Sequence, residues 1–450
     1  MLKNIGKRIG LLALAGVLLT GNSVCAADAE DEKITLRIMH YWGDTDADIS
    51  ARYLKEILEN EFEEAFPNVE LVQEIYDNET YKSKIKVCMA ADEVPDIVFG
   101  YGAGFSETFV KAGKILALDD YLDDFYKEHM LMDMQENFIY DGKLYGICLS
   151  YWTGVLYCNM ALFEEIDAEI PETYEELIEV CERFRDADIQ PIACGILDKW
   201  QAQQFINNYT IQLGGAELYN AIARGEESFD NEILAEAADF TANLVEKGVF
   251  QEDMYQLASN EAEEGFLNGN AAMIYIGSWF TSFAEERLGE NLEVAKMPVV
   301  SSVVESADSV NDSGNNNSDN ASNDSDINSA GVVSHINDYH GGGINGWMVS
   351  ADTEYPELAA DIVAWLGYRL SCYQPENATF IIEEGDEMAE ISETSQEILD
   401  LYKDKANGGV AWDTLMRSDK ADIWLDACTQ LFEGKLDGQE FVKVLDSQMK

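Results

Sequence analysis

The sequence predicts an α/β fold in which a doubly wound parallel sheet is covered by helices. Strand and helix patterns alternate along the first hundred residues. The apolar run PDIVF at 95–99 suits a parallel strand that is buried on both faces. A chain of 450 residues that is 47% apolar is also long enough for two domains of ordinary size.

The first elements follow the order β-α-β-α-β. The alternating run ITLRIM at 34–39 predicts a strand, and apolar residues recur at helical spacing over 49–66. VELVQEI at 69–75 predicts the second strand, 78–93 the second helix and 95–99 the third strand. Parallel strands need helical crossovers, so this order predicts a doubly wound sheet.

A second α/β unit begins after a long extended segment at 141–159. Thr173 and Glu176 have the spacing of a capping box and open an amphipathic helix. PIACG at 191–195 predicts a short strand, and the helix after it contains residues 201–213.

Residues 301–336 differ in composition from the rest of the chain. Of the first 30 residues of this segment, 21 are Ser, Asn or Asp, and almost none can be buried. This composition predicts a disordered surface insertion. Ordered patterns resume at HGGGINGWMVS, 340–350, and helices are expected from there to Lys450.

The amino terminus has the pattern of an export signal. Three cations precede a short apolar stretch at 11–19, and small residues follow around Cys25. We expect residues 1–26 to be removed, although Cys25 could instead carry a lipid. No other stretch reaches 18 apolar residues, so we expect a soluble, exported chain, extracellular or cell-surface, or periplasmic where an outer membrane exists.

Charge and cysteine content exclude several classes of function. The formal net charge of −57 would repel phosphate backbones, so no nucleic-acid partner is expected. Apart from Cys25, seven cysteines remain, without CxxC spacing. The odd number and the missing spacing argue against a disulfide framework or a zinc site. We expect most of these cysteines to be small buried side chains.

Sequence motifs for catalysis, metals and cofactors are absent. The chain has no HExxH, GxSxG or P-loop, and YGAGF at 101–105 lacks the third glycine of a dinucleotide fingerprint. Asp44 begins an alternating acidic run that resembles a calcium loop. Ile49 stands where that loop needs glycine, and Lys55 where it needs glutamate. No metal, cofactor or catalytic residue is therefore predicted, although a glycosidase with paired carboxylates stays an alternative.

Four tryptophans follow predicted strands closely. Trp42, Trp152, Trp200 and Trp279 lie where ligands bind in open α/β sheets. An indole face can cover the C–H face of a sugar ring. One such tryptophan is more often a packing residue, but four together favour a sugar cleft, where Asp44 could reach a hydroxyl. Aspartates 46 and 48 are candidate helix caps, and tryptophans 347 and 365 are predicted core residues.

A series of segments resembles one known family. Their order and spacing are similar to extracellular solute-binding proteins of carbohydrate ABC transporters, the family that includes maltose-binding protein. The segments are ITLRIMHYWG, FEEAFPNVELV, PDIVFGYGAGF, VKAGKILALDDYL, DGKLYGICLSYWTGVLYCNMALFEE, IPETYEELIEVCERF, FLNGNAAMIYIGSW, GGGINGWMVS and LFEGKLDGQEFVKVL.

The resemblance implies a two-lobed periplasmic-binding-protein-like fold of type II, hinged by crossing strands. Lobe 1 would comprise 27–150 and about 341–405, and lobe 2 would comprise 151–300 and about 406–450. It adds Tyr101, Asp198 and the glycines 341–343 to the four tryptophans as ligand contacts. The full set of expected sugar contacts is Trp42, Asp44, Tyr101, Trp152, Asp198, Trp200, Trp279, Gly342 and Gly343, with Trp412 and Asp413 as a WD pair in which packing is at least as plausible.

The function implied by the resemblance is sugar capture for transport. The lobes would close around a mono- or oligosaccharide, and a membrane permease would then recognise the closed monomer. Three alternatives stay open at this point: a sugar-sensing module that signals to a membrane kinase, a secreted glycosidase, and a binding protein for polyamines, iron or peptide.

Overall fold

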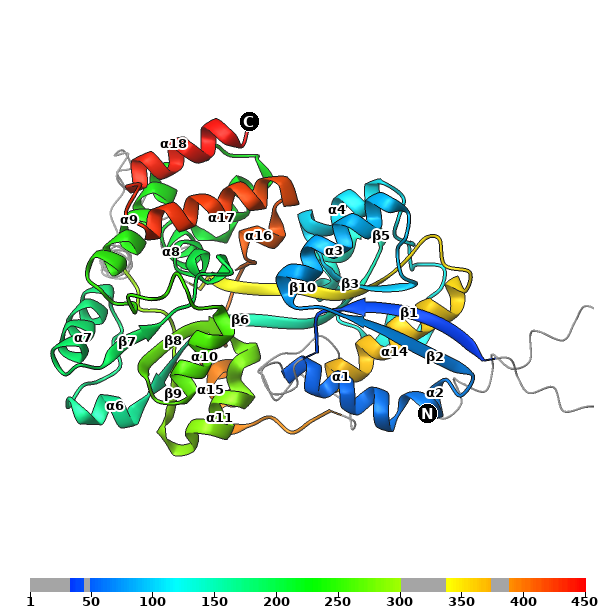
Figure 1. Cartoon of the computed structure of the whole chain (residues 1–450), viewed down its shortest axis with the longest axis horizontal. Helices are drawn as coiled ribbons and strands as arrows, with labels where there is room; N and C mark the ends of the chain where they lie inside the picture. The colour runs from blue at the N-terminus through cyan, green and yellow to red at the C-terminus, as the bar shows by residue number, and fades with distance from the viewer. Residues whose placement is uncertain (1–32, 44–48, 301–336, 374–387) are drawn as a thin grey trace, which may run out of the picture.

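The computed structural model describes residues 33–43, 49–300, 337–373 and 388–450. The predicted signal segment, the predicted insertion and the aspartates 44, 46 and 48 lie outside this part of the chain. Two groups of helices flank a mixed sheet whose two central strands run through both halves of the molecule (Figure 1). The predicted α/β class is confirmed.

The first half contains the predicted β-α-β-α-β unit. Its three strands pair in parallel, with the amino-terminal strand in the middle. The strands are β1 (Ile34–His40), β2 (Val69–Ile75) and β3 (Ile97–Tyr101). The helices are α1 (Ile49–Asn60), α2 (Phe62–Ala65), α3 (Asn78–Ala91), α4 (Ala103–Lys111), α5 (Asp124–His129) and, later in the chain, α14 (Pro356–Tyr373); η3 (Met132–Phe138) leads into the hairpin β4 (Ile139–Tyr140) and β5 (Lys143–Leu144).

The second half has its own parallel pair, formed by β7 and β8. The predicted capping box of Thr173 and Glu176 is present and begins α7. The strands are β7 (Gln190–Ala193), β8 (Ala271–Gly277) and β9 (Leu292–Ala295). The helices are α6 (Met160–Glu165), α7 (Tyr174–Asp186), α8 (Trp200–Arg224), α9 (Glu232–Glu246), α10 (Ser259–Leu267), α11 (Thr281–Leu288), α15 (Glu393–Leu401), α17 (Ser418–Phe432) and α18 (Gly438–Gln448), with short 3-10 turns at Ser278–Phe280 and Gly289–Asn291.

Two long strands join the halves. These are β6 (Ile147–Asn159), which forms most of the predicted extended segment, and β10 (Tyr339–Val349). The strand order is β2-β1-β3-β10-β6-β8-β7. β10 pairs antiparallel with β3 in the first half, and β6 pairs antiparallel with β8 in the second. Because β6 and β10 also pair with each other, both halves share one sheet.

Two short elements follow near the carboxyl-terminal part of the chain. β11 (Gly408–Gly409) pairs with the start of β10, and α16 (Trp412–Leu415) lies against both α4 and α8. α16 therefore contacts both halves.

The predicted division into lobes stays a prediction, and one of its segments lies elsewhere. α15 falls within the range assigned to lobe 1, but it packs against β9 and α11 of the second half. The Thr394 N–H donates to Glu285 Oε1 over 3.0 Å. The lobe range implied by the resemblance does not follow these contacts, because a helical pattern alone does not reveal which sheet face a helix covers.

Aromatic side chains dominate the interior. Trp347 is fully buried in β10, and Trp365 of α14 packs edge-on against Phe62 and Phe66. Both tryptophans were predicted to be core residues, and both predictions are confirmed. The seven cysteines in the described ranges are buried and free, also as predicted.

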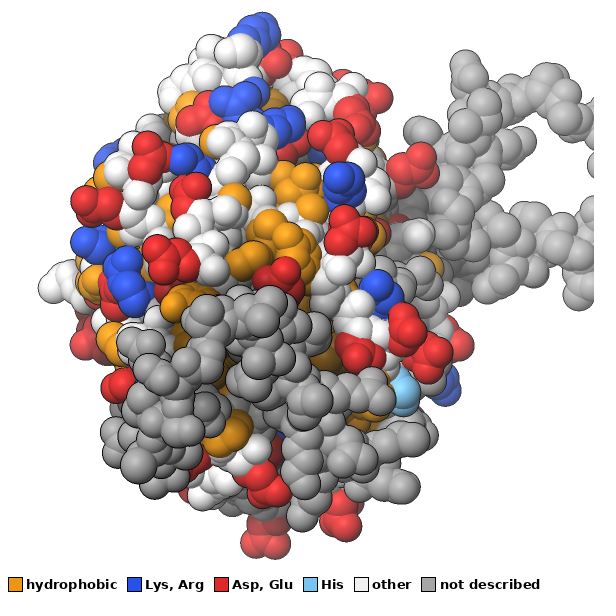
Figure 2. All heavy atoms as spheres, turned by 90° about the vertical axis from the view of Figure 1, so that its right-hand side faces the viewer, with side chains coloured by type: hydrophobic (Ala, Val, Ile, Leu, Met, Phe, Trp, Pro, Cys, Tyr) orange, Lys and Arg blue, Asp and Glu red, His pale blue; other side chains and the backbone are white. Residues whose placement is uncertain are grey.

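On one face of the molecule, acidic side chains are dispersed among basic ones. Figure 2 shows one end of the first half, where red Asp and Glu side chains lie among blue Lys and Arg around a central apolar area. Dispersed charge of this kind is typical of a solvated surface. In the described ranges, no helix is long and apolar enough to cross a membrane.

Candidate functional site

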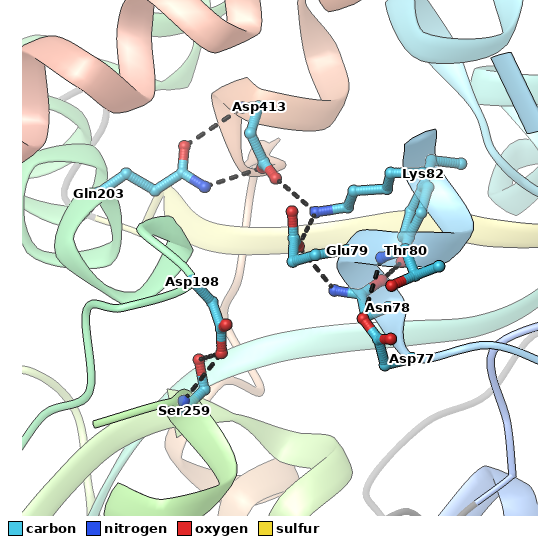
Figure 3. Close-up of polar contacts among 10 residues, drawn as sticks. Asp77, Asn78, Glu79, Thr80, Lys82, Asp198, Gln203, Ser259 and Asp413 are labelled. Carbon is cyan, nitrogen blue, oxygen red and sulfur yellow. Dashed lines mark hydrogen bonds and ion pairs between the residues drawn. The ribbon is translucent and has the colours of Figure 1, made fainter. Parts of the chain in front are cut away.

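Side chains of both halves face each other in front of the crossing strands. Figure 3 shows Asn78, Glu79 and Lys82, from the first turns of α3, opposite Gln203 of α8, with Asp413 of α16 between them. β10 and β6 run behind this group. The α3 helix begins here because the Asp77 carboxylate accepts the Thr80 N–H over 2.9 Å and caps it.

Asp413 is the centre of this polar group. Its Oδ2 lies 3.4 Å from Lys82 Nζ, while Gln203 Nε2 donates to its Oδ1 over 2.8 Å. The Gln203 carbonyl oxygen in turn accepts the Asp413 N–H and the Trp424 indole N–H. Burial would lower the pKa of Lys82, but Asp413 and Glu79 beside it raise that pKa overall. The sequence pointed to Asp413 and missed Lys82 and Gln203.

The Trp412 of the same predicted pair is a core residue. Its side chain is fully buried, with its ring centroid 4.5 Å from that of Trp424 and 4.9 Å from that of Tyr219. The WD pair thus divides its roles: the tryptophan anchors α16, and the aspartate faces the other half.

Tyr101 lies beside the same polar group. Its hydroxyl hydrogen-bonds to Asn78 Oδ1, and Lys82 Nζ lies 5.4 Å from its ring centroid. The ring stacks on Tyr41 at 6.1 Å. Burial raises the pKa of Tyr101 well above its usual value, so the hydroxyl stays protonated as a hydrogen-bond donor.

Trp42 lies in the aromatic core of the first half. Its indole is only 4% exposed and packs edge-on against Phe99 and Trp347. The Trp42 N–H donates to His40 Nδ1 over 3.2 Å. In this conformation Trp42 is part of the aromatic core and does not lie at a surface.

The other three tryptophans form a chain of ring contacts on the second half. Trp200 and Trp279 have centroids 6.3 Å apart, and Trp279 and Trp152 have centroids 5.2 Å apart. Trp152 meets His340 of β10 edge-on at 4.9 Å. Trp200 and Trp279 are half-buried, whereas Trp152 is buried. The structure therefore brings together three of the four predicted tryptophans.

Asp198 has a structural partner in this conformation. Its Oδ2 accepts the Ser259 N–H over 3.0 Å and the Ser259 hydroxyl over 3.1 Å. Ser259 is the first residue of α10, so the carboxylate offsets that helix's free N–H groups and its dipole. Figure 3 shows this pair on the same side of the group as Gln203.

The predicted glycines lie in β10 opposite Trp152. Gly342 pairs with Trp152, and Gly343 pairs with Tyr151. A Cβ on Gly341 would lie 2.3 Å from the Trp152 carbonyl oxygen, so the two crossing strands can approach closely only with glycine there. Gly341 and Gly342 also line a small cavity of about 40 Å³.

A larger cavity of about 440 Å³ lies between the halves beside α16. Its walls come from α4, η3 and β4 of the first half and from α8 and α16–α17 of the second. Among the lining residues are Gly104, Asn137, Tyr140, Arg224 and Met416. None of the predicted tryptophans lines this cavity. The tryptophan chain therefore lies apart from this cavity in the present conformation.

Comparison with known proteins identifies the family. A model of the bacterial extracellular solute-binding protein family matches residues 47–367. The chain belongs to this family. The extracellular solute-binding protein family is exported or periplasmic, and the known members and neighbours found here are binding proteins.

Two curated relatives of this solute-binding protein are similar over part of their length. An uncharacterised ABC transporter extracellular-binding protein of Pyrococcus horikoshii is 23% identical over 60% of this chain and 61% of its own. The multiple sugar-binding protein of Streptococcus mutans is 24% identical over 61% of this chain and 65% of its own. The matched region thus spans less than two thirds of these relatives.

Solved structures match almost the whole solute-binding protein. A protein studied for xylan utilisation in Caldanaerobius polysaccharolyticus has a TM-score of 0.80 and 28% identity, over 93% of this chain and 100% of its own. A chitin oligosaccharide binding protein has a TM-score of 0.77 and 19% identity, over 92% and 98%. These matches confirm the predicted two-lobed fold.

Proposed function

We propose that this protein binds a sugar or short oligosaccharide between its halves and delivers it to the permease of an ABC transporter. The observation that carries the proposal is the meeting of α3, α8 and α16 side chains at Asp413, beside the chain of three tryptophans. Flat indole faces and hydrogen-bonding groups from two elements are the combination that sugar rings require.

Hinge motion at β6 and β10 would open and close the site. A ligand drives closure only if it binds the closed form more tightly, which needs contacts from both halves. Tyr101, Asn78 and Lys82 would supply contacts from the first half, while Trp200, Trp279 and Gln203 would supply them from the second. Asp44, which lies outside the described residues, remains a proposed contact. The closed monomer would be the form that the permease recognises.

Xylo-oligosaccharides are the first ligands to test, because the 28%-identical neighbour comes from a study of xylan utilisation. Titration calorimetry on the exported chain would compare xylotriose with maltotriose, raffinose and triacetylchitotriose. We expect at least one to bind with a negative heat-capacity change. A folded protein that binds none of them would refute the proposal.

Delivery is tested separately from binding. Cells that lack this protein should lose uptake of the radiolabelled sugar, and expression of the intact chain should restore it. A Trp279→Ala chain that folds but binds weakly should restore uptake only at high sugar concentration. Unchanged uptake without the protein would contradict the transport role.

A further inference from the structure

Buried side-chain amides with unpaired polar atoms gather on the first half of α8. Within the described residues, Gln204 Oε1, Asn207 Nδ2 and Oδ1, and Asn208 Nδ2 are buried and unpaired. His340 Nε2, on β10, is also unpaired. These side chains are 2%, 0%, 8% and 2% exposed in chain order. A buried polar atom left unpaired costs about 1–3 kcal/mol, so this concentration of unpaired atoms indicates a bound partner.

Helical spacing places these amides in one row. Counted from Trp200, the amides at 204, 207 and 208 stand at i+4, i+7 and i+8, which is one face of an α-helix, and Ile211 at i+11 continues that face. The row therefore starts at Trp200 and extends about 12 Å along α8 to Asn208.

Ring contacts connect the far end of the row back to the tryptophans. The Tyr275 hydroxyl donates to Asn208 Oδ1 over 3.1 Å and lies 3.5 Å from His340 Nδ1. His340 contacts Trp152, which contacts Trp279, which contacts Trp200. These contacts thus link the amide row to the tryptophan chain between α8 and the crossing strands.

Charged groups around the start of α8 already have partners. Asp413 is paired with Lys82, Asp198 with Ser259, and Lys199 with Asp426 over 2.5 Å. None of the unpaired atoms of the row is charged, because burial also lowers the pKa of His340 to about 3. Amides offer both donors and acceptors, which match hydroxyl groups. An ionised ligand buried there would lack a counter-charge.

We propose that Gln204, Asn207, Asn208 and His340 form the hydroxyl-binding wall of the ligand site, and that this wall selects uncharged sugars against uronic acids and amino sugars. The inference rests on the proposed function and adds its substrate class. Entry of a ligand would require the halves to separate, since all four side chains are buried in the present conformation.

Matched trisaccharides test the selection. Calorimetry at pH 7 on the exported chain would compare xylotriose, maltotriose and triacetylchitotriose with anionic trigalacturonate and with cationic, deacetylated chitotriose. We expect a neutral trisaccharide to bind at least about 100-fold more tightly than either charged one. Equal or tighter binding of a charged trisaccharide would overturn this inference and leave the proposed function standing. Binding of none would overturn both.

Replacing one amide tests the wall itself. Asn207→Leu should weaken binding of the preferred trisaccharide by about 10–100-fold, because two hydrogen-bonding atoms are lost. It should leave the Tm of the sugar-free protein equal or higher, because an unpaired buried amide is removed. Asn207→Ala is the second variant if the leucine does not fit. Unchanged affinity in a folded variant would show that water fills the site and would overturn the inference.

Gln212, on the same helix, provides the matched control. Its Nε2 donates to the Met297 and Pro298 carbonyls, and its Oε1 accepts the Val300 N–H. Gln212→Leu should therefore lower the Tm and leave sugar affinity unchanged. Loss of affinity without loss of Tm identifies an amide that binds ligand, and loss of Tm without loss of affinity identifies a structural one.

Discussion

Lys82 Nζ lies 3.4 Å from Asp413 Oδ2, and this contact joins α3 of the first half to α16 beside α8 of the second. The two side chains are only 15% and 7% exposed. Buried pairs are costly to break on one side, so this contact should favour the closed arrangement of the halves.

Asp413→Asn should therefore shift the sugar-free protein toward an open form. The new amide oxygen can still accept from Gln203, but the charge that attracts Lys82 is lost. We expect a larger radius of gyration by small-angle scattering and about tenfold weaker sugar binding. Lys199→Met is the control, because the exposed Lys199–Asp426 pair should contribute little. An unchanged radius of gyration in the Asp413→Asn variant would contradict this role of the pair.

Gly104 of α4 gives a steric way to separate the halves. A Cβ there would lie 2.4 Å from the Leu415 carbonyl oxygen and 2.4 Å from the Met416 carbonyl carbon. Gly104→Val should wedge α4 away from α16 and reduce sugar affinity about tenfold or more. The control is Gly265→Ala in α10, where a Cβ meets nothing within 4 Å and should stabilise the helix. Unchanged sugar affinity in the Gly104→Val variant would contradict this prediction.

Gly277 fixes the position of Trp279. A Cβ on Gly277 would lie 1.9 Å from Trp279 Cζ3, so Gly277→Ala must displace the indole. We expect the alanine variant to lose sugar affinity by about as much as Trp279→Ala, some 10–100-fold. Tryptophan fluorescence should report the displaced ring even without sugar. If the fluorescence changes and the affinity does not, Trp279 is a packing residue.

His40 should make stability depend on pH. Burial, partly opposed by the Gln73 hydrogen bond, lowers its pKa from 6.5 to about 4. An unfolded histidine binds a proton below pH 6.5, whereas the folded one does so only below about 4. The unfolded state therefore binds more protons in this window, and stability falls as the pH falls, by about 3 kcal/mol in total.

The measurement is the change in Tm between about pH 7 and about pH 4.5. Protonation would place a second N–H donor at Nδ1, against the Trp42 N–H that now donates to it. His40→Asn keeps an acceptor for that N–H and removes the titration, so its Tm should fall less. If Tm falls with pH by the same amount in the unaltered protein and in the His40→Asn variant, His40 is not the source of the pH dependence.

The free cysteines should be inert in the folded protein. Burial raises the pKa of the Cys148 thiol to about 12, and all seven described thiols are buried. When native, a chain cut after Ala26 should react slowly with a disulfide reagent. When unfolded in guanidinium, it should show seven reactive thiols per chain. Reducing agent should leave the Tm unchanged. A Tm that falls on reduction would show that the thiols pair.

Most of the fold could be predicted from periodicity. The βαβαβ order, the capping box at Thr173 and the extended segment that becomes β6 all depend on neighbours within a few residues. The side on which α15 packs could not be predicted, because that choice depends on which face of a distant strand is left uncovered. Local patterns contain no such information.

The candidate site was only partly readable for a similar reason. Tryptophans at strand ends are visible in sequence, and three of them do meet. Trp42 shows the limit, since the residue after a strand can turn into the core as easily as outward. The amide row is visible in the sequence as the run QAQQFINN at 201–208. The buried face of a helix is normally apolar, so this many amides in one run indicate a role other than packing.

The pairing of β10 also has a consequence for how the chain folds. Val349 pairs with Ile97 and Gly341 pairs with Thr153, so the central strand comes from far along the chain. Contacts between such distant residues form late and slowly. Synthesis must therefore pass residue 349 before the sheet can close, and until then β3 and β6 have no strand between them. Until that strand is in place the two halves share no sheet, so their final arrangement can form only after residue 349 has been made.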